Sequence, residues 1–438
     1  MTLKCGWEND SAGRFYISSL QNSSSCTSCW QQRIKRPTFV SSNDNKQITT
    51  APTANMSTTA MKYTILGGGI AGLTTAIALR GIGIQAQVFE SAADIKPVGA
   101  GLLLAANAVQ AYERLGIADR VVHRGHALPT FAILDREGRT LSSADATAIS
   151  RKYGLHNFAI HRAALHDSLL AELDPAQIFT GKKAIKTEQK GDKTLVHFQD
   201  GSTEVTDCLI VADGIHSTIR RQFLPDAAPR YAGYTCWRAV VEARDLSLSA
   251  ATETWGNGCR FGIVPLPEGK VYWFACLNAP ANDPSMKAYT VQDLMKHFGD
   301  FHAPIPQLLS KTSDQDLIWN DIIDLKPIPQ FAFGRVLLIG DAGHATTPNM
   351  GQGACQAIED AVVLADELSK NTTPEAAFQA FERRRMPRTR YIVEQSFSLG
   401  KIAQLQNPFL ATVRNTLFRL LPDSLNERQM RKLFEVDF

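Results

Sequence analysis

A glycine-rich turn early in the chain has the residue types and spacing of a dinucleotide phosphate site. Gly67, Gly69 and Gly72 fit the pattern G-x-G-x-x-G, with Ile70 and Ala71 between the last two glycines. Glycine permits the tight turn, lets a pyrophosphate approach the backbone at Gly69, and allows close packing at Gly72. A helix that begins at such a turn offers free N–H groups and the positive end of its dipole to phosphates.

An acidic residue, Glu90, lies eighteen residues after Gly72 and suits the ribose of the same ligand. A carboxylate accepts hydrogen bonds from ribose hydroxyls and disfavours a 2′-phosphate. The surrounding pattern supplies the elements that would position both groups, with strands at 63–66 and 86–90 and a helix over 70–80. This order predicts a βαβ unit that binds FAD or NAD rather than NADP.

Two longer motifs lie further along the chain. Residues 208–217 read CLIVADGIHS, and residues 340–353 read GDAGHATTPNMGQG. The second follows a buried-strand run at 336–339 and leads into a helix that begins near Ala354. Together with the glycine motif, they resemble the three fingerprints of the class A FAD-dependent monooxygenases, the para-hydroxybenzoate hydroxylase-like family, over residues 61 to about 390.

The resemblance implies FAD as cofactor and NAD(P)H and O₂ as co-substrates. It places Asp341 at a ribityl hydroxyl, Asp213-Gly214 near the pyrophosphate, and Arg162 at the ribityl and phosphate region. Residues 348–354 would lie against the isoalloxazine ring, where a helix N-terminus favours the negative charge of reduced flavin. The candidate cofactor-binding residues are therefore Gly67, Gly69, Ile70, Ala71, Gly72, Glu90, Arg162, Asp213, Gly214, Asp341, Pro348, Gly351, Gly353 and Ala354.

The family's reaction proceeds through an electrophilic flavin C4a-hydroperoxide. The implied activity is therefore hydroxylation or epoxidation of an electron-rich aromatic, heteroaromatic or conjugated small molecule. Two other functions stay open: a flavin halogenase or reductase on the same scaffold, and a non-catalytic FAD-binding module. The halogenase signature W-x-W-x-I-P does not occur in this sequence.

The expected fold class is α/β, with a discontinuous Rossmann-like FAD-binding domain, a mostly antiparallel β-sheet substrate domain and C-terminal helices. We assign the FAD-binding domain to residues 61–130, 155–230 and 331–395. The substrate domain takes residues 131–154 and 231–330, and a helical segment takes 396–438. Strands are expected at 236–242, 260–264 and 271–277, with a hairpin about Glu137-Gly138.

Arg260 and Tyr272 are the candidate substrate-pocket residues. Their spacing, with the sequence TTP at 346–348, is similar to that of FAD-dependent urate hydroxylases, in which an arginine and a tyrosine at these positions face flavin and substrate. We expect Arg260 to orient an anionic group and Tyr272 to form a polar wall, although alternation along a strand allows either side chain to face away. Residues 350–360 resemble zeaxanthin epoxidases instead, so the substrate stays open.

Composition excludes several other classes of protein. The 438 residues are 44% hydrophobic and 20% charged with a net charge of +3, a balance typical of soluble globular enzymes. Residues beyond 60 carry equal numbers of acidic and basic side chains, so no nucleic-acid footprint is expected. Cys26 and Cys29 form a lone C-x-x-C pair, which has too few ligands for a metal site.

Both ends of the chain differ from its body. Residues 1–60 are rich in Ser, Thr and Asn and are expected to be disordered. They are either an organellar transit peptide or a gene-model extension before Met56 or Met61, and we favour the extension and a cytoplasmic enzyme. Near the other end, the run Arg383–Arg390 predicts a solvated helix face, and 409–421 predicts an amphipathic helix. We favour packing of that helix on its own domain over contact with a membrane.

Overall fold

The glycine motif lies in a βαβ unit at the start of the folded chain. This computed structural model describes residues 61–95, 100–145, 157–422, 431–436 and 438, so the segment 1–60 and parts of the assigned domains, at 96–99, 146–156 and 423–430, lie outside the described part. Strand β1 (Tyr63–Leu66) runs into α1 (Ile70–Gly81) and returns as β2 (Ala86–Phe89), which pairs with β1 in parallel. The predicted strand, turn, helix and strand are confirmed.

Strands from three separate stretches of sequence complete a six-stranded sheet around this unit. Its order is β18-β19-β12-β1-β2-β8, and every neighbouring pair is parallel except β18 and β19. Every residue of β1, β12 and β19 is buried, which explains their unbroken apolar sequences, because both faces of the sheet are covered. The added strands are β8 (Ile178–Phe179), β12 (Cys208–Val211), β18 (Ala332–Phe333) and β19 (Val336–Leu338).

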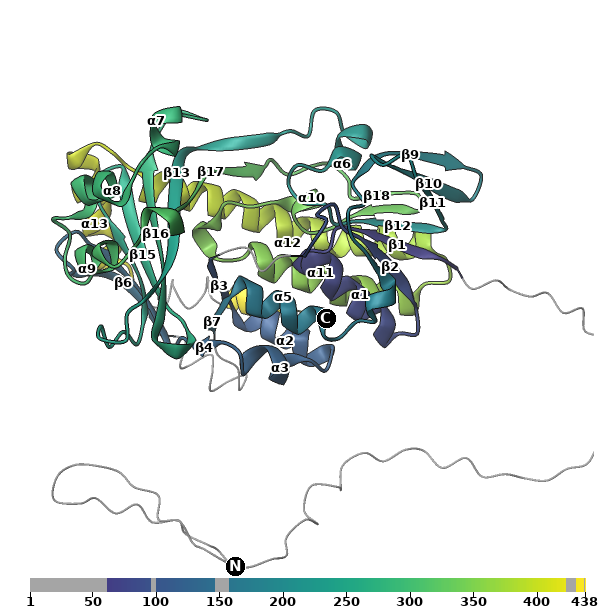
Figure 1. Ribbon diagram of the computed structural model, residues 1–438, viewed down its shortest axis with the longest axis horizontal. Coiled ribbons are helices and arrows are strands. Elements are labelled where there is room, and N and C mark those ends of the chain that lie inside the picture. Colours follow the sequence, from purple (N-terminus) through teal and green to yellow (C-terminus); the bar gives the residue numbers. More distant parts are fainter. Residues whose placement is uncertain (1–60, 96–99, 146–156, 423–430, 437) are drawn as a thin grey trace, which may run out of the picture. The chain divides into compact units, whose positions relative to one another are not determined.

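Helices pack against this sheet and against each other. In Figure 1, α11 lies between α1 and α12, and it contacts both of them and α2. The helices of this region are α2 (Ala106–Arg114), α3 (Ala118–Val122), α5 (Arg162–Leu170), α6 (Thr218–Phe223), α10 (Asp341–His344), α11 (Gly353–Lys370) and α12 (Pro374–Ala403). Two three-stranded sheets accompany them, made of β3 (Gly101–Leu104), β7 (Phe158–His161) and β4 (His126–Ala127), and of β9 (Ala184–Lys190), β10 (Lys193–Phe198) and β11 (Thr203–Thr206).

A second, seven-stranded sheet lies apart from the six-stranded sheet (Figure 1). Its order is β17-β13-β16-β15-β14-β5-β6, and its neighbours are antiparallel except β14 and β5. The hairpin about Glu137-Gly138 and the three strands expected within 236–277 are confirmed. The strands are β5 (Thr130–Asp135), β6 (Thr140–Asp145), β13 (Pro229–Glu242), β14 (Ala251–Trp255), β15 (Cys259–Pro265), β16 (Lys270–Asn278) and β17 (Ile318–Leu325).

Side chains of this second sheet alternate between a hydrophobic core and a cavity. On β16, Trp273 and Ala275 pack in a core with α8 (Val291–Phe298) and α9 (Ile305–Ser310). The intervening Tyr272 and Phe274 line the cavity. Because successive side chains point to opposite faces of a strand, this register brings Tyr272 to the cavity side. The short α7 (Pro284–Lys287) follows β16 in sequence.

The structure corrects one expectation about the C-terminal helices and limits another. The run 383–390 lies in α12, but it is not wholly a solvated face, because Arg385 is only 1% exposed and pairs with acidic residues of α11. Helix α13 (Pro408–Leu420) lies along β6 at the edge of the seven-stranded sheet (Figure 1), but it buries only Ala411 and Arg414. One face of α13 therefore packs on its own domain as expected, but most of its apolar residues are exposed.

Candidate active site

A cavity of about 1760 Å³ is lined by residues from the three sequence motifs and from the seven-stranded sheet. Pockets for single drug-sized ligands are about 300–1,000 Å³, so this cavity has room for more than one such molecule. Twelve of the sixteen candidate residues line it: Gly69, Ile70, Ala71, Arg162, Gly214, Arg260, Tyr272, Asp341, Pro348, Gly351, Gly353 and Ala354. The other four, Gly67, Gly72, Glu90 and Asp213, do not.

The three glycines of the first motif have different structural requirements. A Cβ on Gly72 would lie 1.9 Å from the carbonyl oxygen of Gly67, and one on Gly67 would lie 2.3 Å from that of Ala212. A Cβ on Gly69 would meet no protein atom within 4 Å. Gly67 and Gly72 are therefore required by packing of the chain itself, whereas Gly69 faces open space. The N-cap of α1 is Gly69 and makes no side-chain hydrogen bond, which leaves the first-turn N–H groups available to a phosphate.

Glu90 is held against the glycine turn. Its Oε2 accepts a hydrogen bond from the Gly68 N–H at 2.6 Å, and its Oε1 accepts from the N–H of Ala92 at 2.8 Å. The carboxylate thereby fixes the turn in the position at which Gly69 faces the cavity. Its predicted contact with a ribose stays a prediction.

The second and third motifs meet the first at the cavity. A Cβ on Gly340 would lie 2.8 Å from the Cβ of Ala71, so the turn that precedes Asp341 approaches α1 closely. Arg220, which follows the second motif, donates from Nη1 to the carbonyl oxygen of Ala342 at 3.1 Å. Segments more than a hundred residues apart therefore converge on one wall of the cavity.

Two carboxylates near this convergence have raised pKa values. Asp341 borders the cavity, and the protein atoms packed around it raise the pKa of its carboxyl, against the opposing charges of His344 and Arg162. Burial raises the pKa of Asp213 to about 6, and its Oδ1 is buried with no hydrogen-bond partner among the described residues. A buried acceptor without a partner beside a ligand cavity is what a hydroxyl group of a bound polyol ligand would satisfy, because a hydroxyl can donate a hydrogen bond.

The N-terminus of α11 forms the next part of the wall. The helix begins at Gly353 without a side-chain cap, and its N-cap, Gln352, is 1% exposed. A short 3₁₀ turn, Pro348–Met350, precedes it and ends at Gly351, whose φ of +63° is a left-handed conformation that glycine adopts without strain. An eighteen-residue helix with a free N-terminus favours negative charge at this point of the cavity.

A buried ionic network behind α11 fixes the third motif. Asp360 accepts from the Gly340 N–H at 2.8 Å and from His344 Nε2 at 2.6 Å. Arg385 of α12 donates from Nε to the other oxygen of Asp360 at 2.7 Å and also pairs with Glu359. The network ties the turn that carries Asp341 to two long helices.

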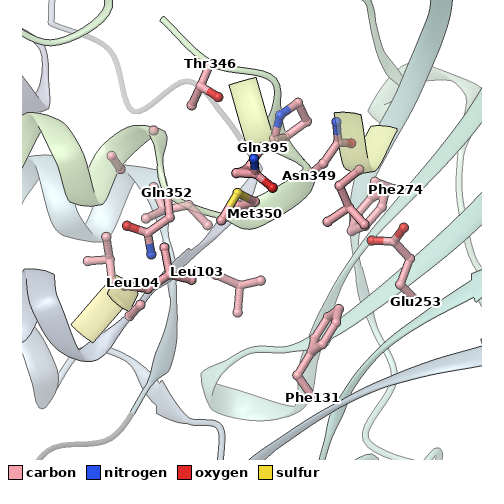
Figure 2. Close-up of a pocket in the computed structure, with 18 of the residues that line it drawn as sticks. Leu103, Leu104, Phe131, Glu253, Phe274, Thr346, Asn349, Met350, Gln352 and Gln395 are labelled. Carbon is pink, nitrogen blue, oxygen red and sulfur yellow. The ribbon is translucent and has the colours of Figure 1, made fainter. Parts of the chain in front are cut away.

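The seven-stranded sheet contributes an ion pair to the opposite wall. Arg260 is 2% exposed, and its Nη1 donates to Glu253 Oε1 at 3.0 Å, which also accepts from Trp255 Nε1 at 2.8 Å. The Arg260 Nη2 donates to Asn349 Oδ1. Figure 2 shows Glu253, Phe131 and Phe274 on the sheet side, facing Leu103 and Met350.

Sequence reasoning missed several residues of this site, namely Phe131, Arg238, Glu253, Phe274, Asn349 and Gln352. Asn349 and Gln352 belong to the third motif, so their proximity to the cavity was detectable. Glu253 offered one signal, an acidic residue between two threonines in a segment of strand-forming residues.

The geometry fits a dinucleotide cofactor. Two uncapped helix N-termini, an open glycine turn, and Asp341 with Arg162 line one continuous cavity that exceeds a nucleotide in volume. This arrangement defines an FAD-binding oxidoreductase, in which α1 would hold the pyrophosphate and α11 the ring.

Comparison with known proteins identifies the family. Residues 60–396 match the family described as FAD binding domain, and the chain belongs to the class A FAD-dependent monooxygenases of that family. It is 38% identical over 380 residues to an aurachin C monooxygenase/isomerase of Stigmatella aurantiaca, covering 86% of this chain and 98% of the relative. It is 34% identical over 379 residues to a 2-heptyl-3-hydroxy-4(1H)-quinolone synthase of Pseudomonas aeruginosa, covering 85% and 98%.

Solved structures agree with this assignment. The crystal structure of Klebsiella pneumoniae HpxO complexed with FAD and uric acid superposes with a TM-score of 0.80 at 30% identity, covering 86% of this chain and 97% of that one. The protein is thus an FAD-dependent monooxygenase that uses NAD(P)H and O₂, and the predicted fold class, cofactor and activity are confirmed. Within the described ranges, no helix combines the length and apolar character needed to cross a bilayer.

Proposed function

We propose that the substrate is a neutral heteroaromatic ring that bears a ring N–H and an apolar substituent, as a 2-alkyl-4-quinolone does. The Pseudomonas relative, which is named for a 2-heptyl-3-hydroxy-4(1H)-quinolone, supports this class of substrate. The apolar side chains of the cavity beyond the flavin region also support it, among them Leu128, Phe131, Ile133, Leu399 and Phe418.

The observation that carries the proposal is the neutralised charge of Arg260. Its guanidinium is buried and paired with Glu253. The ion pair as a whole has no net charge and therefore does not attract a substrate carboxylate. Glu253 Oε1 accepts both the Arg260 and Trp255 hydrogen bonds, whereas Oε2 accepts none from the described residues and is not fully buried. A carboxylate oxygen that borders the cavity favours a substrate with a hydrogen-bond donor and repels an anion.

These contacts give the chain's residues specific roles in the reaction. Bound FAD would supply the oxygen-activating chemistry, with electrons from NAD(P)H and the oxygen atom from O₂. Glu253 Oε2 accepts a hydrogen bond from the ring N–H of the substrate. This contact orients the ring and increases the electron density at the ring carbon that is conjugated with the nitrogen. Arg260 holds the Glu253 carboxylate in place, and Tyr272 and Phe274 form the wall beside it. Arg260 thus acts through Glu253 rather than as the lone anion-orienting group expected from the sequence.

A substrate panel tests the proposal. Substrate-stimulated NAD(P)H oxidation is measured with 2-heptyl-4-quinolone and with a hydroxybenzoate, and mass spectrometry detects a product that is heavier by one oxygen atom. We expect coupled turnover of the quinolone only. Glu253→Gln and Arg260→Ala should each lower quinolone turnover at least tenfold or divert NAD(P)H oxidation to peroxide, since one charge-assisted hydrogen bond contributes about 1.5–3 kcal/mol.

One further variant separates the alternative substrate class. Arg238 lines the cavity, donates to Asn320 Oδ1 at 2.7 Å, and has no acidic partner in the described part of the chain. An aromatic carboxylate would use this cation. Two results together would refute the proposal. The wild-type enzyme would turn over the hydroxybenzoate with coupling that Arg238→Met loses, and the quinolone would not stimulate NAD(P)H oxidation.

A further inference from the structure

Helix α13 presents an apolar face that no described part of the chain covers. Phe409 and Leu420 are each 73% exposed, and Leu417 is 58% exposed. With Val413, they occupy positions i, i+4, i+8 and i+11, which lie on one face of a helix. Isolated exposed apolar residues are ordinary on a protein surface, but a continuous row of them marks an interaction site.

The same part of the chain forms one end of the catalytic cavity. Phe418 of α13 lines the cavity and packs edge-on against Trp255. Trp255 in turn donates a hydrogen bond to Glu253 of the proposed substrate site. Ile402 and Leu421 both line the cavity and are 41% and 40% exposed on the surface. The apolar wall of the cavity is therefore continuous with the apolar face of α13.

The segment that carries this face has a net positive charge. From Gln395 to Pro422 the chain contains Lys401, Arg414 and Arg419 and no acidic residue. Arg419 pairs with Asp135 of β5, and Arg414 is buried, where it donates to backbone carbonyl oxygens of Ala403 and Gly256. Lys401 is exposed and makes no ion pair within the described part of the chain. An anionic lipid surface complements this segment, whereas the identical segment of a second copy would repel it.

We propose that α13 lies in the headgroup region of an anionic bilayer, and that an apolar substituent of the substrate enters the cavity from the bilayer between Ile402 and Leu421. The inference rests on the proposed function, because only a substrate with an apolar tail needs such an entrance. A helix that lies flat in the interface requires an apolar face and basic residues and no membrane-spanning length.

Vesicle binding of the full-chain holoenzyme tests the surface itself. The wild-type enzyme should co-sediment with phosphatidylglycerol–phosphatidylcholine vesicles, and less of it should do so at high salt. Phe409→Asp/Leu420→Asp should bind at least about tenfold more weakly, because two large apolar side chains can no longer be buried in the bilayer. The matched control is Ile185→Asp/Val205→Asp, which changes two exposed apolar residues of β9 and β11 and should bind as the wild type does.

Delivery of substrate tests the entrance and separates this inference from the proposed function. A quinolone without a tail, dissolved in buffer, should be turned over equally by the wild type and by both double variants. A 2-heptyl-4-quinolone held in vesicles should be turned over about tenfold more slowly by Phe409→Asp/Leu420→Asp alone. Failure of the buffer reaction refutes the proposed substrate and leaves vesicle binding intact. Absence of wild-type vesicle binding, equal binding by both double variants, or self-association through α13 refutes the membrane inference.

Discussion

The two walls of the cavity use different parts of the polypeptide. Along the six-stranded sheet, the wall is largely backbone, formed by the turn at Gly69, the N-termini of α1 and α11, and the left-handed turn at Gly351. Along the seven-stranded sheet, it consists of side chains, with Glu253 and Arg260 paired among aromatic rings. A backbone wall binds what every member of the family shares, whereas a side-chain wall can change with the substrate.

The difference also sets how each wall tolerates substitution. Behind the backbone wall, at Gly67 and Gly72, an added methyl group meets main-chain atoms, and the glycine turn must shift. On the side-chain side, a substitution changes a contact and leaves the sheet in place. We therefore expect variants of the first wall to lose the fold or the flavin, and variants of the second to lose coupling or specificity.

The largest effect is expected at Gly72. Gly72→Ala places a Cβ 1.9 Å from the Gly67 carbonyl oxygen, so the glycine turn cannot keep its geometry. We expect little soluble protein and no bound flavin, measured by yield and by absorbance of the flavin. Gly69→Ala is the matched control, because its Cβ meets no protein atom within 4 Å. It should fold normally and bind FAD more weakly. Equal behaviour of the two variants would contradict the distinct roles assigned to these glycines.

A smaller effect on stability is expected when the buried ionic network behind the backbone wall loses one of its members, Arg385. Arg385→Met removes one of the partners of Asp360 and one of the partners of Glu359, and breaking a buried ion pair costs up to about 3–5 kcal/mol. We expect the free energy of unfolding in urea to fall by about 3 kcal/mol, with weaker flavin retention because Asp360 holds the Gly340 N–H. Arg383→Met, an exposed position of the same helix, should change stability by less than about 0.5 kcal/mol. Similar values for both variants would mean that the network does not position the third motif.

This asymmetry explains what the sequence could predict. The backbone wall requires glycine residues at fixed spacing beside apolar strands, and such local requirements can be recognised within a single short segment of the sequence. The pairing of Glu253 with Arg260 depends on the register of β14 and β15, and the contact of Arg260 with Asn349 joins residues far apart in the chain. Arg385 lay within a charge run typical of a solvated face, because its acidic partners are on another helix. Tertiary contacts of this kind leave no local pattern.

The smallest effect is expected from the pH dependence of Asp213, at the edge of the backbone wall. Burial raises its pKa in the folded protein to about 6, whereas an unfolded Asp titrates near 3.9. The folded state therefore favours the protonated form, and this contribution to stability is complete below about pH 4 and is lost as the pH rises through 6. Asp213→Asn should match the wild type near pH 4 and exceed it above pH 6 by on the order of 2 kcal/mol, measured by urea unfolding across pH. The exposed substitution Asp226→Asn serves as control and should follow the wild type throughout. A variant Asp213→Asn that is less stable than the wild type at pH 8 would show that the ionised carboxylate has a favourable partner in the fold.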